Sequence, residues 1–271
     1  MKSFFSKICV FVKRDFLIET SYKLAFGLAW MNIFVLAIMF YYISKLFHGM
    51  KSVSLEEYGG EYFPFVFIGL ALSGYLKTAL LTFSRKIRTE QMMGTLEAMI
   101  TTPTSILTII TALPIWSFIF NAVPVIIYFL FGIYFFGITT INSNYAGMFI
   151  IIILTMISSA SIGIISASFI IVFKNGDPLA WAISLFSDFF AGAFFPISLL
   201  PAGLRSISKL LPMTYTLKYL RGAFLQGYTF NMLLPYITIL TVFSAVLFPL
   251  SILIFIYSIH RAKITGSLSH Y

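Results

Sequence analysis

The sequence predicts an all-α membrane protein, a single domain with six transmembrane helices. Of its 271 residues, 59% are hydrophobic and 10% are charged, whereas soluble domains carry about 25% charged residues. The mean hydropathy is +0.96. A helix needs roughly 20 apolar residues to cross a bilayer, and the chain has room for about six such stretches. The loops between them are too short to form a separate soluble domain.

The N-terminal segment, residues 3–22, is predicted to be an amphipathic helix on the membrane surface. Phe4, Ile8 and Val12 recur along one side of this helix, whereas basic residues occupy the remaining sides. Interfacial helices typically show this pattern. The alternative interpretation is a ragged extension of the first span.

The first two spans are expected at residues 24–46 and 62–83. Lys77 lies late in the second span, where a charge is costly unless it is paired or reaches the headgroups. We expect the Lys77 side chain to extend toward the cytoplasmic headgroups.

A polar segment separates the second span from the third. Apolar residues such as Met92, Leu96 and Met99 recur in it at three- and four-residue spacing, which predicts a short amphipathic helix over residues 89–101. One face of this helix can lie against the protein or the membrane, and another face is free to contact a partner.

Prolines shape two later stretches. The third span, residues 106–136, exceeds one bilayer crossing and is expected to kink or tilt at Pro114 and Pro124, because proline removes a backbone donor. Residues 198–227 are too polar to span and too apolar for an ordinary loop, so they are predicted to form short re-entrant helices before the last span at 232–259. The basic residues of the re-entrant segment are expected at the surface: Arg205, Lys209, Lys218 and Arg221.

Two intermediate spans contain polar candidates. The fourth span, residues 145–172, is rich in small residues that let another helix approach closely. Its Ser161 and Ser166 fit either ordinary helix packing or a substrate path. The fifth span, residues 179–196, contains Asp188, and a carboxylate inside a membrane either marks a functional site or pairs with a group on a neighbouring helix.

The distribution of basic residues predicts the orientation. With six spans, both termini lie on one side, and cytoplasmic loops are enriched in Lys and Arg. The side with the termini carries eleven basic residues against six on the other side, so both termini are predicted to be cytoplasmic. The basic residues within 198–227 argue for the opposite orientation.

The sequence lacks the motifs of a catalytic, nucleotide or metal site. It contains no phosphate-binding G-x-x-x-x-G-K-[ST] loop, and none of its three histidines has a second ligand at metal-site spacing. The net charge of +9 is typical of basic cytoplasmic loops facing anionic lipid rather than of nucleic-acid binding. We therefore expect no enzyme activity and no cofactor in this chain.

The segment Glu90–Pro103, E-Q-M-M-G-T-L-E-A-M-I-T-T-P, resembles the cytoplasmic signature of ABC-2 type permeases, the membrane subunits of ATP-binding-cassette exporters. The L-P-M-T-Y…L-R-G stretch at Leu211–Gly222 and the overall order of elements are also similar to that family. The likeness is slightly greater to the daunorubicin and lipo-oligosaccharide branch.

This resemblance implies partners and a location. It implies a homodimer of permeases, two cytoplasmic ATPase subunits that bind ATP and Mg²⁺, and the plasma membrane of a prokaryote. The ATPases would dock on the helix at 89–101 and on the N-terminal helix. The residues implied in this coupling are Glu90, Gly94, Thr95, Leu96, Glu97 and Pro103.

Within the coupling segment, Glu90 and Glu97 are the candidates for charged contacts with the ATPase. Gly94 would allow close approach, and Pro103 would fix the turn into the third span. The alternative is that this helix is a passive surface linker.

The implied function is export of an amphipathic, lipid-linked, glycoconjugate or drug-like substrate. One alternative is a secondary transporter driven by an ion gradient, with Asp188 and Lys77 as the coupling pair, although the sequence lacks the matching broken helices of such proteins. Another alternative is a membrane scaffold that transports nothing.

Overall fold

The computed structural model describes residues 4–21, 23–46, 56, 62–102, 104–134, 144–173 and 178–264. Every regular element in these ranges is helical, which confirms the predicted all-α class. In chain order the elements are α1 (Phe4–Ser21), α2 (Lys23–Leu46), α3 (Tyr62–Met92), α4 (Thr95–Thr101), α5 (Ile106–Ala112), α6 (Ile115–Tyr134), α7 (Tyr145–Phe173), α8 (Pro178–Phe190), the 3₁₀ helix η2 (Ile197–Leu199), α9 (Ala202–Ser208), α10 (Pro212–Leu225) and α11 (Phe230–Ile264).

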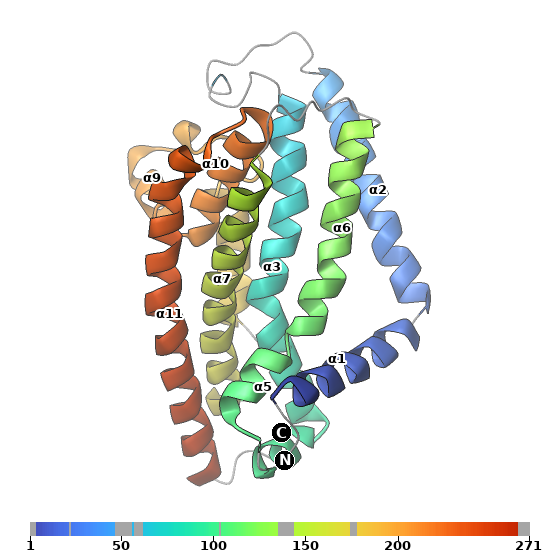
Figure 1. Ribbon diagram of the computed structural model, residues 1–271, viewed down its shortest axis with the longest axis vertical. Coiled ribbons are helices and arrows are strands. Elements are labelled where there is room, and N and C mark those ends of the chain that lie inside the picture. The colour runs from blue at the N-terminus through green and yellow to red at the C-terminus, as the bar shows by residue number, and fades with distance from the viewer. Residues whose placement is uncertain are drawn as a thin grey trace.

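The long helices form a bundle organised around α3 and α7 (Figure 1). Helix α7 packs against α3 on one side and α11 on another, and α6 packs against α3. Helix α1 lies obliquely across the end of the bundle where α5 also lies, whereas α9 and α10 lie at the opposite end. We call the end with α1 and α5 the α4 end of the bundle, and the end with α9 and α10 the α10 end.

Four helical stretches in the described part of the chain are long and apolar enough to cross a bilayer: Tyr62–Met92, Ile106–Tyr134, Tyr145–Phe173 and Phe230–Ile264. The prediction of six spans is therefore supported for four of them. Helix α2 has 24 residues and is about 36 Å long, but is not among these four. Helix α8 has only 13 residues, which gives about 20 Å against a hydrocarbon core of about 30 Å.

The fifth span is thus shorter than predicted, because the chain leaves the helix after Phe190. Gly192 has a φ of +79°, which reverses the chain, and residues 191–195 form turns and bends. The turn exposes the Gly192 and Ala193 carbonyls to the guanidinium of Arg221, which donates to both.

Small residues let α7 approach its neighbours closely, as predicted. A Cβ at Gly163 would lie 2.3 Å from the Leu80 carbonyl oxygen on α3. On another side of α7, the Ser158 and Ser244 hydroxyls lie 2.9 Å apart. Both Ser161 and Ser166 are fully buried, and the Ser161 hydroxyl donates to Ile157 O in its own helix.

The predicted third span is broken once. Helix α5 ends at Ala112 and α6 starts at Ile115, and Pro114 lies in the break because it has no N–H to continue the helical ladder. Helix α6 continues through Pro124.

Arg221 corrects the prediction that every basic residue of the re-entrant segment lies at the surface. Arg205 and Lys209 are exposed, but Arg221 is 2% exposed. Its guanidinium donates to three carbonyl oxygens, those of Phe65 at 3.0 Å, Gly192 at 2.7 Å and Ala193 at 2.8 Å, and its Cζ lies 3.6 Å from the centre of the Phe65 ring. A fork of donors can satisfy several acceptors at once, so Arg221 fixes α10 against α3 and the turn after α8.

Candidate coupling site

The polar segment between the second and third spans forms two elements rather than one. Helix α3 continues to Met92, and Gly94 then adopts a φ of +70° before α4 begins at Thr95. A residue with a Cβ is strained at this φ, whereas glycine is not. The predicted helix at 89–101 is therefore divided by a left-handed turn, and residues 89–92 extend the second span.

Helix α4 has one buried and one exposed side. Leu96 is 1% exposed and belongs to an apolar cluster with Ile87 of α3, Ile109 of α5 and Phe255 of α11. Glu97, by contrast, is exposed on α4. Leu96 therefore anchors α4 in an apolar cluster to which α3, α5 and α11 also contribute.

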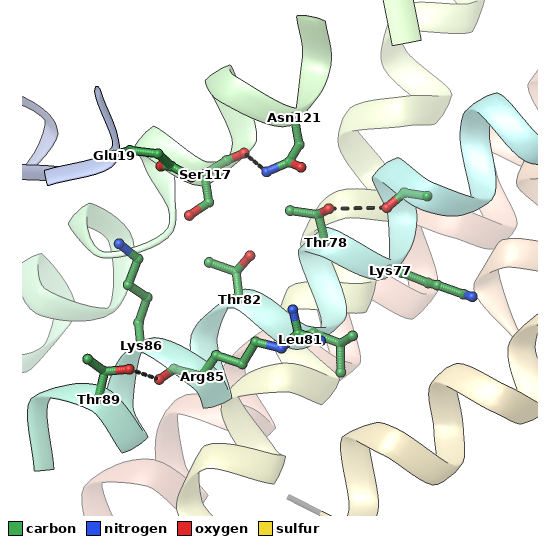
Figure 2. Close-up of a pocket in the computed structure, with 11 residues that line it drawn as sticks. Glu19, Lys77, Thr78, Leu81, Thr82, Arg85, Lys86, Thr89, Ser117 and Asn121 are labelled. Atoms are coloured by element: carbon green, nitrogen blue, oxygen red, sulfur yellow. Dashed lines mark hydrogen bonds between the residues drawn. The ribbon is translucent and has the colours of Figure 1, made fainter. Parts of the chain in front are cut away.

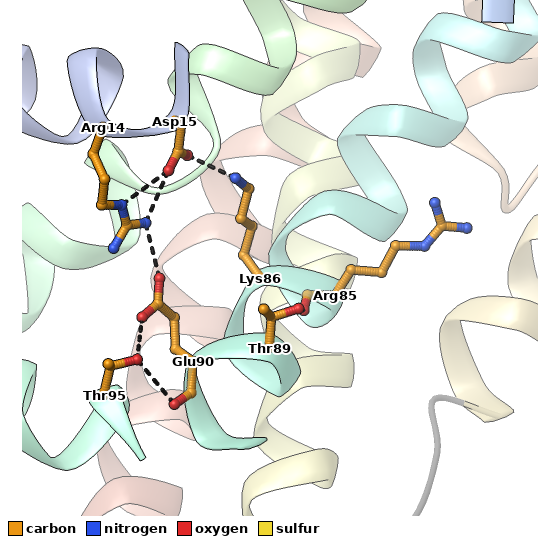
Figure 3. Close-up of polar contacts among 7 residues, drawn as sticks. All are labelled: Arg14, Asp15, Arg85, Lys86, Thr89, Glu90 and Thr95. Carbon is orange, nitrogen blue, oxygen red and sulfur yellow. Dashed lines mark hydrogen bonds and ion pairs between the residues drawn. The ribbon is translucent and has the colours of Figure 1, made fainter. Parts of the chain in front are cut away.

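A polar cluster joins the α4 end of α3 to α1. We define it as Arg14, Asp15, Lys86, Glu90 and Thr95 (Figure 3). Asp15 accepts from Arg14 at 2.9 Å and from Lys86 at 2.7 Å, and Arg14 also contacts Glu90 at 2.8 Å. Thr95 donates its hydroxyl to the Glu90 side chain and, at 3.1 Å, to the Glu90 carbonyl.

The two carboxylates of the polar cluster are buried, since Asp15 is 3% and Glu90 7% exposed. A buried carboxylate is tolerated only when it is paired and hydrogen-bonded, and both conditions are met here. The members of the cluster come from α1, α3 and α4. The cluster thus connects these three helices.

Two further contacts tie α1 to neighbouring parts of the chain. Lys7 Nζ donates to Thr104 Oγ1 at 3.1 Å, just before α5. Trp116 Nε1 donates to Glu19 Oε2 at 2.7 Å, on α6. Helix α1 is consequently docked along its length rather than being a loose extension of α2.

A family model described as ABC-2 type transporter matches residues 6–225, which is most of the chain. The chain belongs to this family. It is therefore a multi-pass membrane protein and the permease of an ABC-type transporter, a subunit that typically has no ATPase site and that generally works with ABC ATPase partners. No individually curated protein matches the sequence.

The ABC-2 fold places the predicted coupling residues in different surroundings. Glu90 and Thr95 contact each other within the polar cluster, Leu96 lies in the core, and Glu97 faces outward. Pro103 lies outside the described residues.

The predicted intramembrane residues lie on three different helices. Asp188 lies on α8, but its side chain is outside what the structure describes. Ser161 and Ser166 are buried in α7, and Lys77 of α3 lines a cleft between α1, α3 and α6 (Figure 2). In the described part of the chain, no group of three His, Cys, Asp or Glu side chains could hold a metal ion.

Sequence reasoning missed the partners that complete the polar cluster. The helical pattern of residues 3–22 does not predict which distant residues Arg14 and Asp15 contact, and a basic residue such as Lys86 between two spans is typical of a cytoplasmic loop. The available signal is the carboxylate of Asp15 next to Arg14. A carboxylate is unusual on a basic helix at the membrane surface, so it indicates a specific ionic contact.

Proposed function

We propose that this ABC-2 permease is the membrane subunit of an exporter, and that the end of α3 together with α4 receives the movement of a cytoplasmic ATPase. The observation that carries the proposal is the contrast between the two sides of α4. Its inner side is held by Leu96 and by the Thr95–Glu90 contact, and its outer side exposes Glu97. A short helix held on one side and open on the other can pass a displacement inward.

The surface next to α4 suits a protein partner. Met92 and Met93 are 64% and 71% exposed, and they precede the exposed Glu97 by a few residues in the chain. Flexible methionine side chains adapt to a partner's surface, and a nearby carboxylate selects for a complementary cation. We assign Glu97 to the charged contact and Glu90 to holding α1 and α4 together.

The proposed exporter contains additional chains. In it, two ATPase subunits hold ATP and Mg²⁺, and a second, identical permease completes the membrane part. The α4 end and both termini face the cytoplasm of a prokaryotic cell, consistent with the excess of basic residues on that side. The substrate is amphipathic, lipid-linked, glycoconjugate or drug-like, and it moves outward across the plasma membrane.

The charge of Glu97 provides the test. In the permease reconstituted with its ATPase, Glu97→Lys should lower both co-purification and permease-stimulated ATP hydrolysis by at least about tenfold, because a reversed charge in a contact opposes binding. Glu56→Lys is the matched control, since Glu56 is also exposed but lies outside α4.

Two results would contradict the proposal. One is equal ATPase binding and hydrolysis with wild-type, Glu97→Lys and Glu56→Lys permeases. The other is transport in proteoliposomes that proceeds on an ion gradient with no nucleotide, which would favour a secondary transporter instead.

A further inference from the structure

Three residues in the described part of the chain bury side-chain polar atoms that have no hydrogen-bond partner: Ser73 and Gln91 of α3, and Thr214 of α10. Ser73 and Thr214 each leave one hydroxyl unpaired, whereas Gln91 leaves both its amide nitrogen and its amide oxygen unpaired. Buried polar groups without a partner are rare in native proteins, and each one calls for a physical explanation. Gln91 is the strongest case of the three, because it lacks both a donor and an acceptor.

Gln91 lies where α3 ends and the chain turns into α4. It is 5% exposed, whereas the next residue, Met92, is 64% exposed. The backbone carbonyl of Gln91 accepts from the N–H of Gly94 at 3.1 Å, which closes the turn in which Gly94 has a φ of +70°. The backbone of Gln91 is therefore part of the turn that sets the direction of α4, while its side chain forms no hydrogen bond with the described residues.

The preceding residue, Glu90, shows how a buried polar side chain is normally satisfied at this position. Its carboxylate contacts Arg14 at 2.8 Å and accepts from the Thr95 hydroxyl (Figure 3). Successive side chains point about 100° apart around a helix, so Gln91 does not share the partners of Glu90. Two consecutive buried polar residues thus differ, because Glu90 is held by its neighbours and Gln91 is not.

The unpaired amide destabilises the arrangement of the turn that the structure shows. A buried amide loses its hydrogen bonds to water, and without a protein partner it gains nothing in return. This cost disappears in any arrangement that gives the amide a partner or exposes it to water. An apolar side chain of the same length at position 91 would avoid the cost while α4 stays in place.

We propose that Gln91 is a positioning residue for coupling, and that its unpaired amide lowers the work needed to displace α4. Leu96 and the Thr95–Glu90 contact hold α4 in place, and the amide of Gln91 opposes them. When the ATPase displaces α4, the turn at Gly94 opens and water reaches the amide. This inference rests on the proposed function of α4, and it adds a buried residue to the exposed ones already assigned to coupling.

The first test measures the permease alone. Full-length wild-type and Gln91→Met permeases are purified in detergent without any ATPase. Methionine is flexible and similar in length to glutamine but has no amide, so Gln91→Met should raise the melting temperature by about 2–4 °C. Hydrogen–deuterium exchange of the backbone amides in α4 should slow about tenfold, because opening the turn no longer releases a buried polar group.

Thr214→Val is the matched control. It also removes an unpartnered buried group, because valine has the shape of threonine without the hydroxyl, but it lies on α10. The melting temperature should rise in this variant too, while hydrogen exchange in α4 stays within about twofold of wild type, because distant sites act independently. The control therefore separates a general gain in stability from an effect on α4. Gln91→Leu, which is shorter and branched, repeats the first test with a different apolar side chain.

The second test adds the ATPase. Gln91→Met should bind it as wild type does, because Gln91 is buried. Permease-stimulated ATP hydrolysis should nevertheless fall about fivefold, because the variant favours the undisplaced position of α4. Thr214→Val should leave both the binding and the hydrolysis unchanged.

Two results would overturn the inference. A lower melting temperature or faster exchange in α4 for Gln91→Met would show that the amide has a partner that stabilises the turn. Unchanged ATP hydrolysis in Gln91→Met would show that the amide has no role in coupling. If Glu97→Lys leaves ATPase binding unchanged, the proposed function fails, whereas the exchange measurement on the permease alone still decides whether Gln91 destabilises the turn into α4.

Discussion

The two ends of α3 are held by different kinds of contact. Its first turns lie beside Arg221, which donates to backbone carbonyls, whereas its last turns carry charged side chains that form ion pairs. At the α10 end, the acceptors belong to the backbone of Phe65, Gly192 and Ala193. At the α4 end, Asp15 and Glu90 meet Arg14 and Lys86.

The two arrangements differ in how much movement they tolerate. Carbonyl oxygens are fixed by the backbone, so the Arg221 contacts require one particular packing of α3, α10 and the turn after α8. The polar cluster instead uses long, rotatable side chains, so its members can shift relative to one another while the buried Asp15 and Glu90 stay paired. We therefore expect the α10 end to be more rigid than the α4 end.

Replacing Arg221 should produce the largest effect. Arg221→Leu leaves three buried carbonyls without their donor, and we expect a loss of about 3–5 kcal/mol in the free energy of unfolding. Arg221→Lys should recover little of it, because an ammonium does not reproduce the geometry of the guanidinium fork. Thermal unfolding of the detergent-solubilised protein measures both variants. Wild-type stability in Arg221→Leu would show that the carbonyls need no donor.

Gly69 tests the rigidity of the same end through sterics alone. A Cβ at this position would lie 2.1 Å from Ala193 O and 2.3 Å from Arg221 Nη2, so Gly69→Ala should cost about 2–3 kcal/mol. Gly74→Ala, on the same helix with nothing within 4 Å, should be neutral or stabilising by up to about 1 kcal/mol. Equal melting temperatures for the two variants would show that the α10 end adapts more readily than its contacts imply.

The smallest effect is expected at the α4 end. Glu90→Gln keeps acceptors for Arg14 and Thr95 but removes the charge, so we expect a loss of about 1–2 kcal/mol. Glu97→Gln, on the exposed side of α4, should change stability by less than about 0.5 kcal/mol. Chemical denaturation compares the two variants. A larger loss for Glu97→Gln would reverse the assignment of the buried and exposed sides.

The features that could be predicted from the sequence are those that depend on neighbouring residues. The bounds of α1, α2 and α7 follow from helical periodicity and from the length of apolar stretches, and the structure places them within a residue or two of the prediction. The polar segment between the second and third spans could also be predicted, because a motif and a break in hydropathy coincide there, but the turn at Gly94 within it could not.

The features that could not be predicted depend on contacts between distant parts of the chain. Lys86 and Asp15 are 71 residues apart, and Arg221 and Phe65 are 156 apart. A basic residue in a segment rich in prolines is typical of a surface, and only the packing of α3 against α10 shows that Arg221 is buried.

Helix α3 carries both Gly69, against Arg221, and Glu90, in the polar cluster. These residues are 21 positions apart in one unbroken helix, a separation of about 32 Å. Such a helix behaves as a stiff rod with one clamped end and one tethered end. We expect a force applied at the tethered end to tilt the helix about its close contacts at Gly69.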